Sequence, residues 1–338
     1  AALGGSVFGA LRAAFPVVRA TPGPDTLLVA GFGRSAVTLD PAVVAARFRD
    51  RRIASDTFVP ELFPLFLEPG NVARVEAALA DVSRRVPPSC DDRPVSLLHA
   101  LARRQRETAS LAGRAFGALG RLPASLLVVL VLLPSAAFAA RAVLTSGSGR
   151  RAMLHAAAAT GAGGMALSFL LLLSYQTREG ALYGALGALT AAFMLGLAAG
   201  AAGSHRLVSS RTPSPRPALL VALLAAAAAF AATALLLPAL ASLSAFPPAV
   251  SLGAHAGLLL LAGTATGSLF PVAARVLLDS GESAGSAAAL FEAADHLGAA
   301  FAALLAGVVL VPVLGMRATG LLAAVLVLLA AAGVARFR

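Results

Sequence analysis

The sequence predicts a mainly α-helical fold: a polytopic membrane bundle of about seven spans, preceded by a piece of a soluble α/β domain. Two observations predict it. Of the 338 residues 58% are hydrophobic, and the mean hydropathy of +0.84 exceeds that of ordinary soluble domains. The chain also changes character near Arg121–Pro123, because charged residues are frequent before this point and long apolar runs dominate after it. We therefore expect two domains, residues 1–120 and 121–338.

The first 120 residues alternate between helical and extended patterns. Asp40 is a good N-cap for one predicted helix, and Pro41 suits its first position. In chain order we predict a helix at Ser6–Phe15, strands at Val17–Ala20 and Thr26–Phe32, and helices at Pro41–Arg49, Asn71–Val86 and Val95–Arg114. A helix, a hairpin and further helices are typical of the end of a doubly wound α/β domain.

Beyond the junction, seven apolar runs are each about long enough to cross a bilayer, since about 20 helical residues cover roughly 30 Å of hydrocarbon. The predicted spans are Ala124–Val143, Ala152–Leu173, Ala181–Ala202, Ala218–Leu240, Val250–Phe270, Ala287–Val311 and Ala318–Val334. Gly196 with Gly200, and Gly263 with Gly267, form small-residue faces that favour close helix packing. The Gly267–Pro271 stretch predicts a kink near the end of the fifth span.

The charge pattern argues against nucleic-acid binding. The formal net charge is +11, and all 27 basic residues are arginines. They lie at span ends and in the first 120 residues without a basic stripe interleaved with aromatic residues, so we interpret them as membrane-flanking and surface charge. The lone Cys90 excludes an intrachain disulfide. No signal-peptide pattern begins at Ala1, which falls inside a predicted helix, so we expect the chain to be a fragment.

Polar side chains inside the predicted spans are the first candidates for a functional site, because each costs a few kcal/mol in hydrocarbon unless it is paired or hydrated. Glu292, Asp295 and His296 are three and four residues apart and share one face of the sixth span. They could form a cation or polyamine site, a proton relay or a metal site, although no second group of metal ligands accompanies them. The structural alternative is a hydrogen-bonded anchor that grips Arg275 or a carbonyl of another helix.

A second polar patch lies at the turn between the second and third spans. Gln176 and Tyr183 are candidate pocket residues if they point inward. The alternative is an aromatic belt at the membrane interface beside a solvated turn. His255, alone in the fifth span, is expected to be packed and hydrogen bonded rather than to act as a ligand.

In the first domain the densest polar run is Ser89–Pro94, which includes Asp91, Asp92 and Arg93. It predicts a turn with a capping aspartate before the helix that starts near Val95. These 120 residues contain no glycine-rich phosphate loop, no GxSxG motif and no paired acid and base. We therefore expect that none of these 120 residues can catalyse a reaction by itself.

Short stretches in a fixed order carry a family resemblance. In the first domain they are Ala13–Pro16, Thr26–Ala30, Leu39–Pro41 and Asp91–Val95. In the spans they are Gly164–Leu167, Tyr175–Gln176, Tyr183–Gly184, Phe193–Leu197, Phe270–Pro271, Ala293–Ala300 and Val311–Gly315. These stretches resemble bacterial membrane-bound spermidine synthase-like proteins, in which an aminopropyltransferase-type domain is fused to transmembrane helices. Ser89 and Cys90 replace the Asn and Thr of the family's NTDxRP motif, and Ser168 stands where a glutamate is usual.

The resemblance implies that residues 1–120 are the C-terminal end of a Rossmann-like, methyltransferase-type α/β domain. It implies aminopropyl transfer, in polyamine biosynthesis, from decarboxylated S-adenosylmethionine to an amine such as putrescine, with no cofactor held by this chain. The donor pocket, the glycine-rich loop and the catalytic aspartate would lie before Ala1, so no catalytic residue carries over. It also implies a multi-pass protein of the bacterial inner membrane whose partners are the lipid bilayer and a small amine, with no nucleic acid.

Two other functions are open at this stage. The helices could form a carrier for a small cationic solute, in which case uptake of a labelled polyamine should vanish in Asp295→Ala. They could instead be a structural anchor that holds a soluble enzyme at the membrane, in which case Glu292, Asp295 and His296 should tolerate apolar replacement.

Overall fold

The computed structural model describes residues 2–23, 25–33, 36–108, 118, 122–144, 149–180, 183–209 and 216–335. Its contacts divide the chain into two compact units. The first, called the N-terminal unit here, is Ala1–Cys90 with Pro94–Gly113, and the second, the helical unit, is Asp91–Arg93 with Arg114–Arg338. The expected junction at Arg121 lies outside the described residues.

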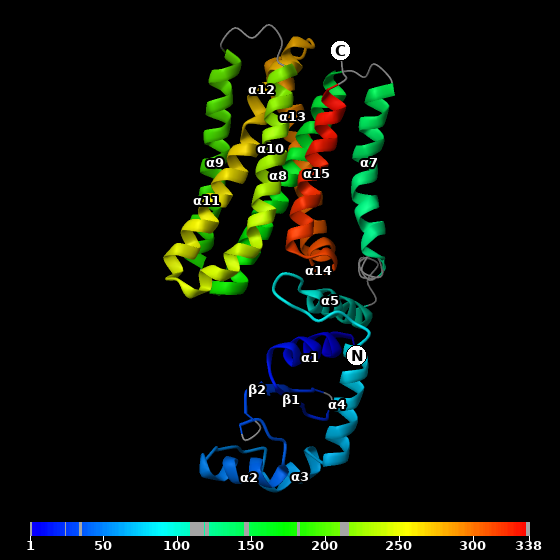
Figure 1. Cartoon of the computed structure of the whole chain (residues 1–338), viewed down its shortest axis with the longest axis vertical. Coiled ribbons are helices and arrows are strands. Elements are labelled where there is room, and N and C mark those ends of the chain that lie inside the picture. The colour runs from blue at the N-terminus through cyan, green and yellow to red at the C-terminus, as the bar shows by residue number, and fades with distance from the viewer. Residues whose placement is uncertain are drawn as a thin grey trace. The chain divides into compact units, whose positions relative to one another are not determined.

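The N-terminal unit is built from helices and one small hairpin (Figure 1). Its elements are α1 (Ala2–Ala14), β1 (Val17–Ala20), β2 (Leu28–Gly31), α2 (Pro41–Asp50), the 3₁₀ helix η1 (Pro60–Leu62), α3 (Phe63–Phe66), α4 (Pro69–Ser83) and α5 (Val95–Thr108). β1 and β2 pair antiparallel, with Val17 opposite Gly31. No Rossmann-type parallel sheet is present in the described part of this unit, so only the hairpin and the helices of the expected α/β domain end are observed.

Local capping explains where two of these helices begin. The Asp40 carboxylate accepts hydrogen bonds from the backbone amides of Ala42 and Val43 at 2.9 and 3.3 Å, which confirms it as the N-cap of α2. Glu68 caps α4 in the same way. The sequence did not predict η1 and α3, because these short turns are interrupted by prolines and show no helical periodicity. The predicted end of the last helix, after residue 108, lies outside the described residues.

The helical unit contains seven helical spans long and apolar enough to cross a membrane, which confirms the predicted number. Its elements are α7 (Ala124–Leu144), α8 (Gly149–Glu179), α9 (Tyr183–Ser209), α10 (Arg216–Leu236), the 3₁₀ helix η2 (Leu237–Ala245), α11 (Pro248–Gly267), α12 (Leu269–Asp279), α13 (Ala284–Leu305), the π-helical turn η3 (Ala306–Leu310), α14 (Val311–Leu314) and α15 (Met316–Val334). The predicted start of the third span at Ala181 lies outside the described residues. The fifth span is longer than predicted, because the helix resumes as α12.

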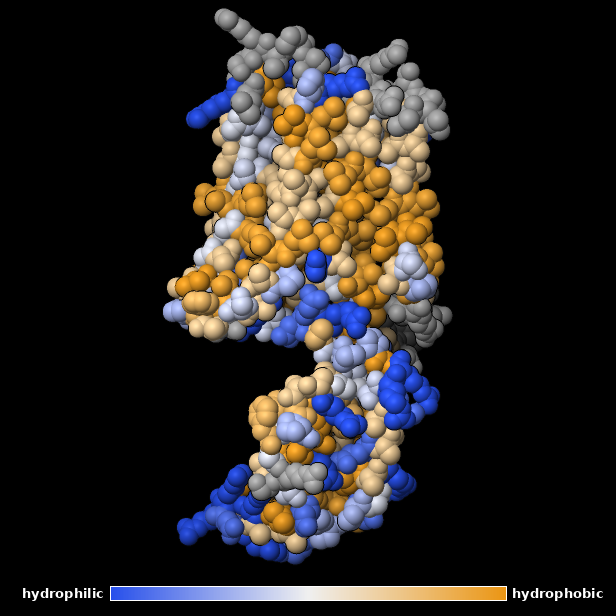
Figure 2. Space-filling model, viewed as in Figure 1, coloured by the Kyte–Doolittle hydropathy of each residue, from blue (hydrophilic) through white to orange (hydrophobic). Residues whose placement is uncertain are grey.

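Burial places α8 at the centre of this unit and α7 at its edge. Of the apolar window of α8, 67% is buried inside the unit, against 17% for α7. Apolar side chains cover the middle of the unit and polar side chains gather at its ends (Figure 2). The helical unit therefore has the surface that a lipid environment requires.

Two predicted small-residue motifs pack against each other where α9 meets α11. A Cβ atom on Gly196 would lie 2.9 Å from the backbone nitrogen of Thr264, and one on Gly263 would lie 3.1 Å from that of Leu197. Gly200 and Gly267 are equally close to the opposite backbone. The prediction that these glycines form a helix-packing face is confirmed.

Prolines lie inside three of the spans, and two of these spans are interrupted beside them. Pro271 has no N–H to donate to the carbonyl of Gly267, and α11 ends there before α12 begins at Leu269, which confirms the predicted kink. Pro134 lies inside α7. Pro312 cannot donate to the carbonyl of Val308, and the π-helical turn η3 occupies this position. Pro134 and η3 both border the cavity described below.

Candidate functional site

Asp295 on α13 faces α8 at a point where the two helices approach closely. Its side chain is 26% exposed. A Cβ atom on Gly161 would lie 2.5 Å from Oδ1 of Asp295, so only glycine fits on α8 opposite this carboxylate. The predicted anchor on Arg275 is not formed, because Arg275 pairs with Asp279 at 2.9 Å.

Glu292 and His296 do not share this buried position. The His296 side chain is 80% exposed, and its Nδ1–H donates to the carbonyl of Glu292 at 2.9 Å. Its Nδ1 lies 3.8 Å from Oδ2 of Asp295, and Glu292 is exposed. The structure thus brings the three residues to one stretch of α13 but turns only Asp295 toward another helix. Within the described chain, no group of three potential metal ligands comes together.

The second predicted patch separates into an exposed and a buried part. Gln176 and Tyr183 are both exposed. The neighbouring Tyr175 is buried, and its ring meets that of His255 edge to face at a centroid distance of 5.4 Å. His255 is also buried; its Nδ1 lies 2.8 Å from the carbonyl oxygen of Ser251, which confirms the predicted packed and hydrogen-bonded role.

Asp91, Asp92 and Arg93 group with the helical unit. The carbonyl of Asp92 accepts a hydrogen bond of 2.9 Å from the backbone amide of Met316, the first residue of α15. A helix does start at Val95 as predicted. The residue that accepts a hydrogen bond from the first turn of this helix is a serine rather than an aspartate. Ser89 Oγ accepts from the backbone amide of Ser96 at 3.2 Å. This motif therefore contacts the start of a span, which its sequence did not indicate.

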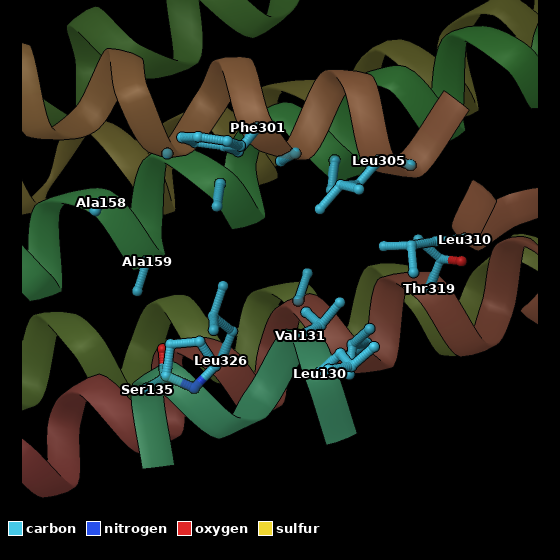
Figure 3. Close-up of a pocket in the computed structure, with 18 of the residues that line it drawn as sticks. Leu130, Val131, Ser135, Ala158, Ala159, Phe301, Leu305, Leu310, Thr319 and Leu326 are labelled. Carbon is cyan, nitrogen blue, oxygen red and sulfur yellow. The ribbon is translucent and has the colours of Figure 1, made fainter. Parts of the chain in front are cut away.

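A cavity of about 450 Å³ lies between α7, α8, α13 and α15. Figure 3 shows Phe301 and Leu305 of α13 facing Leu130 and Val131 of α7 across it. The floor is formed by small residues of α8, among them Ala159. The remaining lining is mostly aliphatic, so the cavity suits an apolar group.

Among the described residues that line this cavity, three carry polar side-chain atoms: His155, Ser135 and Thr319. Thr319 donates to the carbonyl of Gly315 within its own helix. The imidazole of His155 stacks on Phe138 of α7 at a centroid distance of 4.4 Å. Its Nε2 is buried, and no group in the described residues hydrogen bonds to it. A buried nitrogen of this kind costs free energy unless a ligand or water satisfies it.

Sequence reasoning missed this cavity. His155 lies in an alanine-rich part of the second span. A histidine there does not by itself indicate a cavity, because a packed core histidine would look the same in the sequence. The signals that could have found it were Pro134 and Pro312, because each predicts a distorted helix. The sequence does not show which helices surround these two prolines, because that depends on the tertiary packing.

No protein-family model, curated protein or solved structure matches this chain.

Proposed function

We propose that this chain is the C-terminal part of a membrane-integrated, spermidine synthase-like protein. Residues 1–120 would close its Rossmann-like transferase domain, and the seven helices would hold it in a bacterial inner membrane. Two things support the proposal: the order of the family-like stretches along both units, and the open hairpin of the N-terminal unit. The hairpin is the structural observation that carries it.

The hairpin has the features of the last two strands of a larger sheet. The amide of Thr21 donates to the carbonyl of Leu27, so these two residues form a hydrogen-bonded pair. In an antiparallel pair of strands every second residue bonds to the partner strand, and the residues between them direct their backbone N–H and C=O groups outward. Leu28 and Ala30 therefore direct these groups away from β1. No further strand pairs with this edge in the described residues. Phe32, just beyond β2, is 80% exposed. A hairpin alone is marginally stable in water, so an adjoining strand fits this edge.

The chemistry under this proposal is a nucleophilic substitution. The unprotonated nitrogen of the amine attacks the aminopropyl carbon next to the sulfonium sulfur of the donor. The carbon–sulfur bond breaks, a thioether leaves, and the nitrogen gives its proton to a base. Carboxylates would hold the cationic amine. All of these groups would belong to the part of the domain that precedes Ala1.

The direct test supplies the full-length protein, in detergent or nanodiscs, with decarboxylated S-adenosylmethionine and putrescine. Mass spectrometry should detect spermidine and a thioether in equal amounts. If neither product forms with an intact, folded preparation, aminopropyl transfer is contradicted.

A pair of variants tests the open edge itself. In the full-length protein, Phe32→Asp should impair folding or transfer, because a neighbouring strand would bury this position. The matched control is Leu65→Asp on α3, since Leu65 is also strongly exposed but is not next to the hairpin. Equal, small effects of both substitutions would argue against a continued sheet.

A second function, a carrier for a small cation, is favoured by one observation. The carboxylate of Asp295 lies at a helix–helix contact inside an apolar span, where a charge is costly unless it serves a function. Labelled putrescine should then enter proteoliposomes made with the wild type and not those made with Asp295→Asn. Glu292→Gln, an exposed position on the same helix, is the control. Uptake that is absent in all three preparations would leave the helices as a structural anchor.

A further inference from the structure

We propose that the cavity between α7, α8, α13 and α15 binds one long acyl chain, with His155 hydrogen bonding to the oxygen-bearing head of that chain. The inference is independent of the transfer chemistry. It rests only on the membrane location proposed above, which a separate labelling experiment tests.

The shape of the cavity fits a single extended chain. On α8 its lining runs from His155 to Ala166, which is about 16 Å at 1.5 Å per residue. A cavity of about 450 Å³ that is drawn out over this length is an elongated site, as an extended chain requires.

The cavity opens toward the lipid-facing surface. Two of its lining side chains, Phe301 of α13 and Leu130 of α7, are 65% and 47% exposed, so they form the rim of its mouth. They lie on opposite sides of the opening in Figure 3. α7 packs against α15, and Pro134 of α7 lines the cavity. A chain that diffuses in the bilayer can enter here without passing through water.

One end of the cavity is suited to a polar head. His155 is six residues from the first residue of α8, about 9 Å along its axis, and so lies near that end of the span. Its Nε2 lacks a partner among the described residues. A carboxylate or ester oxygen would accept a hydrogen bond from Nε2–H there.

The other end of the cavity is apolar. Leu310 of η3 and Leu305 of α13 lie there, and Thr319 directs its hydroxyl to its own helix. Figure 3 shows Leu310 and Thr319 at one end and Ser135 at the other. The chain would therefore lie with its methyl end at Leu310 and its head at His155.

The experiment uses the full chain in nanodiscs and a palmitic acid that carries a photoreactive diazirine in its chain. Peptide mapping after irradiation should place the label on α7 and α13 next to the cavity. Ala302→Phe fills the cavity and should lower labelling at least tenfold. The matched control, Ala300→Phe, adds the same volume at an exposed position of α13 and should leave labelling unchanged. Ala162→Leu is a milder filling variant in case Ala302→Phe does not fold.

His155→Phe tests the polar contact, because it retains the stack on Phe138 and removes Nε2. The affinity for palmitic acid should fall about fivefold, the effect of one hydrogen bond. Native mass spectrometry of the wild type separates the two sources of such a chain, a free fatty acid and a phospholipid, by the mass of the adduct. Equal labelling of the filled and control variants overturns the site, and an unchanged affinity in His155→Phe overturns the role of the histidine.

Discussion

Gly161 is the residue on which the position of Asp295 depends. Because a side chain there would collide with the carboxylate, the contact between α8 and α13 is set by the absence of a Cβ atom. The exposed Glu292 and His296 lie on the same stretch of α13 without such a contact. Within this cluster, Asp295 is therefore the residue whose side chain abuts α8.

Gly161→Ala should destabilise the protein. The added methyl group forces α13 away from α8, at a cost of about 1 to 3 kcal/mol. Gly187→Ala on α9 is the control, because a Cβ atom there meets nothing within 4 Å, and alanine should be neutral or gain up to about 1 kcal/mol. The measurement is the thermal unfolding midpoint of both variants in the same detergent. Equal midpoints would contradict the close approach.

His99 should make the N-terminal unit sensitive to acid. Burial lowers the pKa of this imidazole below 6.5, and no described group hydrogen bonds to its buried Nε2. The unfolded chain therefore binds the proton more readily, so stability is full above pH 6.5 and falls as the pH drops toward the folded pKa. The protection factors of the α5 amides, which correct for the base-catalysed intrinsic exchange rate, should be lower at pH 5.5 than at pH 7.5. In His99→Phe this difference should shrink, and a difference as large as in the wild type would exclude His99 as its cause.

The spacing of Glu292, Asp295 and His296 predicted a shared helix face, and the structure places all three on adjacent turns. The sequence could not predict that only Asp295 is turned inward. That difference depends on where α8 passes, and hence on Gly161, which lies more than a hundred residues away in the chain. For the same reason, the sequence predicted that His255 is packed and hydrogen bonded, but it could not predict which residues its partners are.

At the scale of elements, α9 and α11 are held together by glycines on both sides. Gly263→Leu should separate these helices and destabilise the protein by at least about 2 kcal/mol, because the new side chain meets backbone rather than a movable side chain. Gly257→Leu on the same helix meets nothing within 4 Å and is the control. Chemical unfolding in mixed micelles compares the two. A control that unfolds as readily as Gly263→Leu would contradict this packing.

The hairpin of the N-terminal unit is held at its β1 edge by Glu76 of α4. Its Oε1 accepts from Nε of Arg19 at 2.7 Å and from the backbone amide of Ala20 at 3.1 Å. Glu76→Ala should cost about 1 to 3 kcal/mol and speed hydrogen exchange in β1. Glu61→Ala removes an exposed ion pair with Arg49 and should leave β1 exchange unchanged. Unchanged exchange in Glu76→Ala would show that the strand is held by other contacts.

The spans could be predicted from the sequence because each needs only a long apolar run, which is a local property. The cavity could not, since it arises where α7 packs on α15 and leaves a gap beside α8 and α13. Pro134 and the π-helical turn before Pro312 are visible as local signals. Their joint effect is a property of four helices together.

At the scale of the whole molecule, the account depends on one architectural claim: a helical unit that crosses a bilayer seven times. Because the fifth span would cross the bilayer once, the turn after the fourth span and the turn after the fifth span should lie on opposite sides. The aminopropyltransferase proposal and the acyl-chain proposal both need this arrangement, and they differ in which part of the chain they use.

The most direct test is cysteine labelling in sealed spheroplasts or vesicles, starting from a Cys90→Ser background. Phe246→Cys reports the turn between η2 and α11, and Ser280→Cys reports the turn between α12 and α13; both positions are exposed. A membrane-impermeant maleimide should label one of them in intact membranes and the other only after permeabilisation. Equal labelling of both from one side would contradict the seven-span bundle.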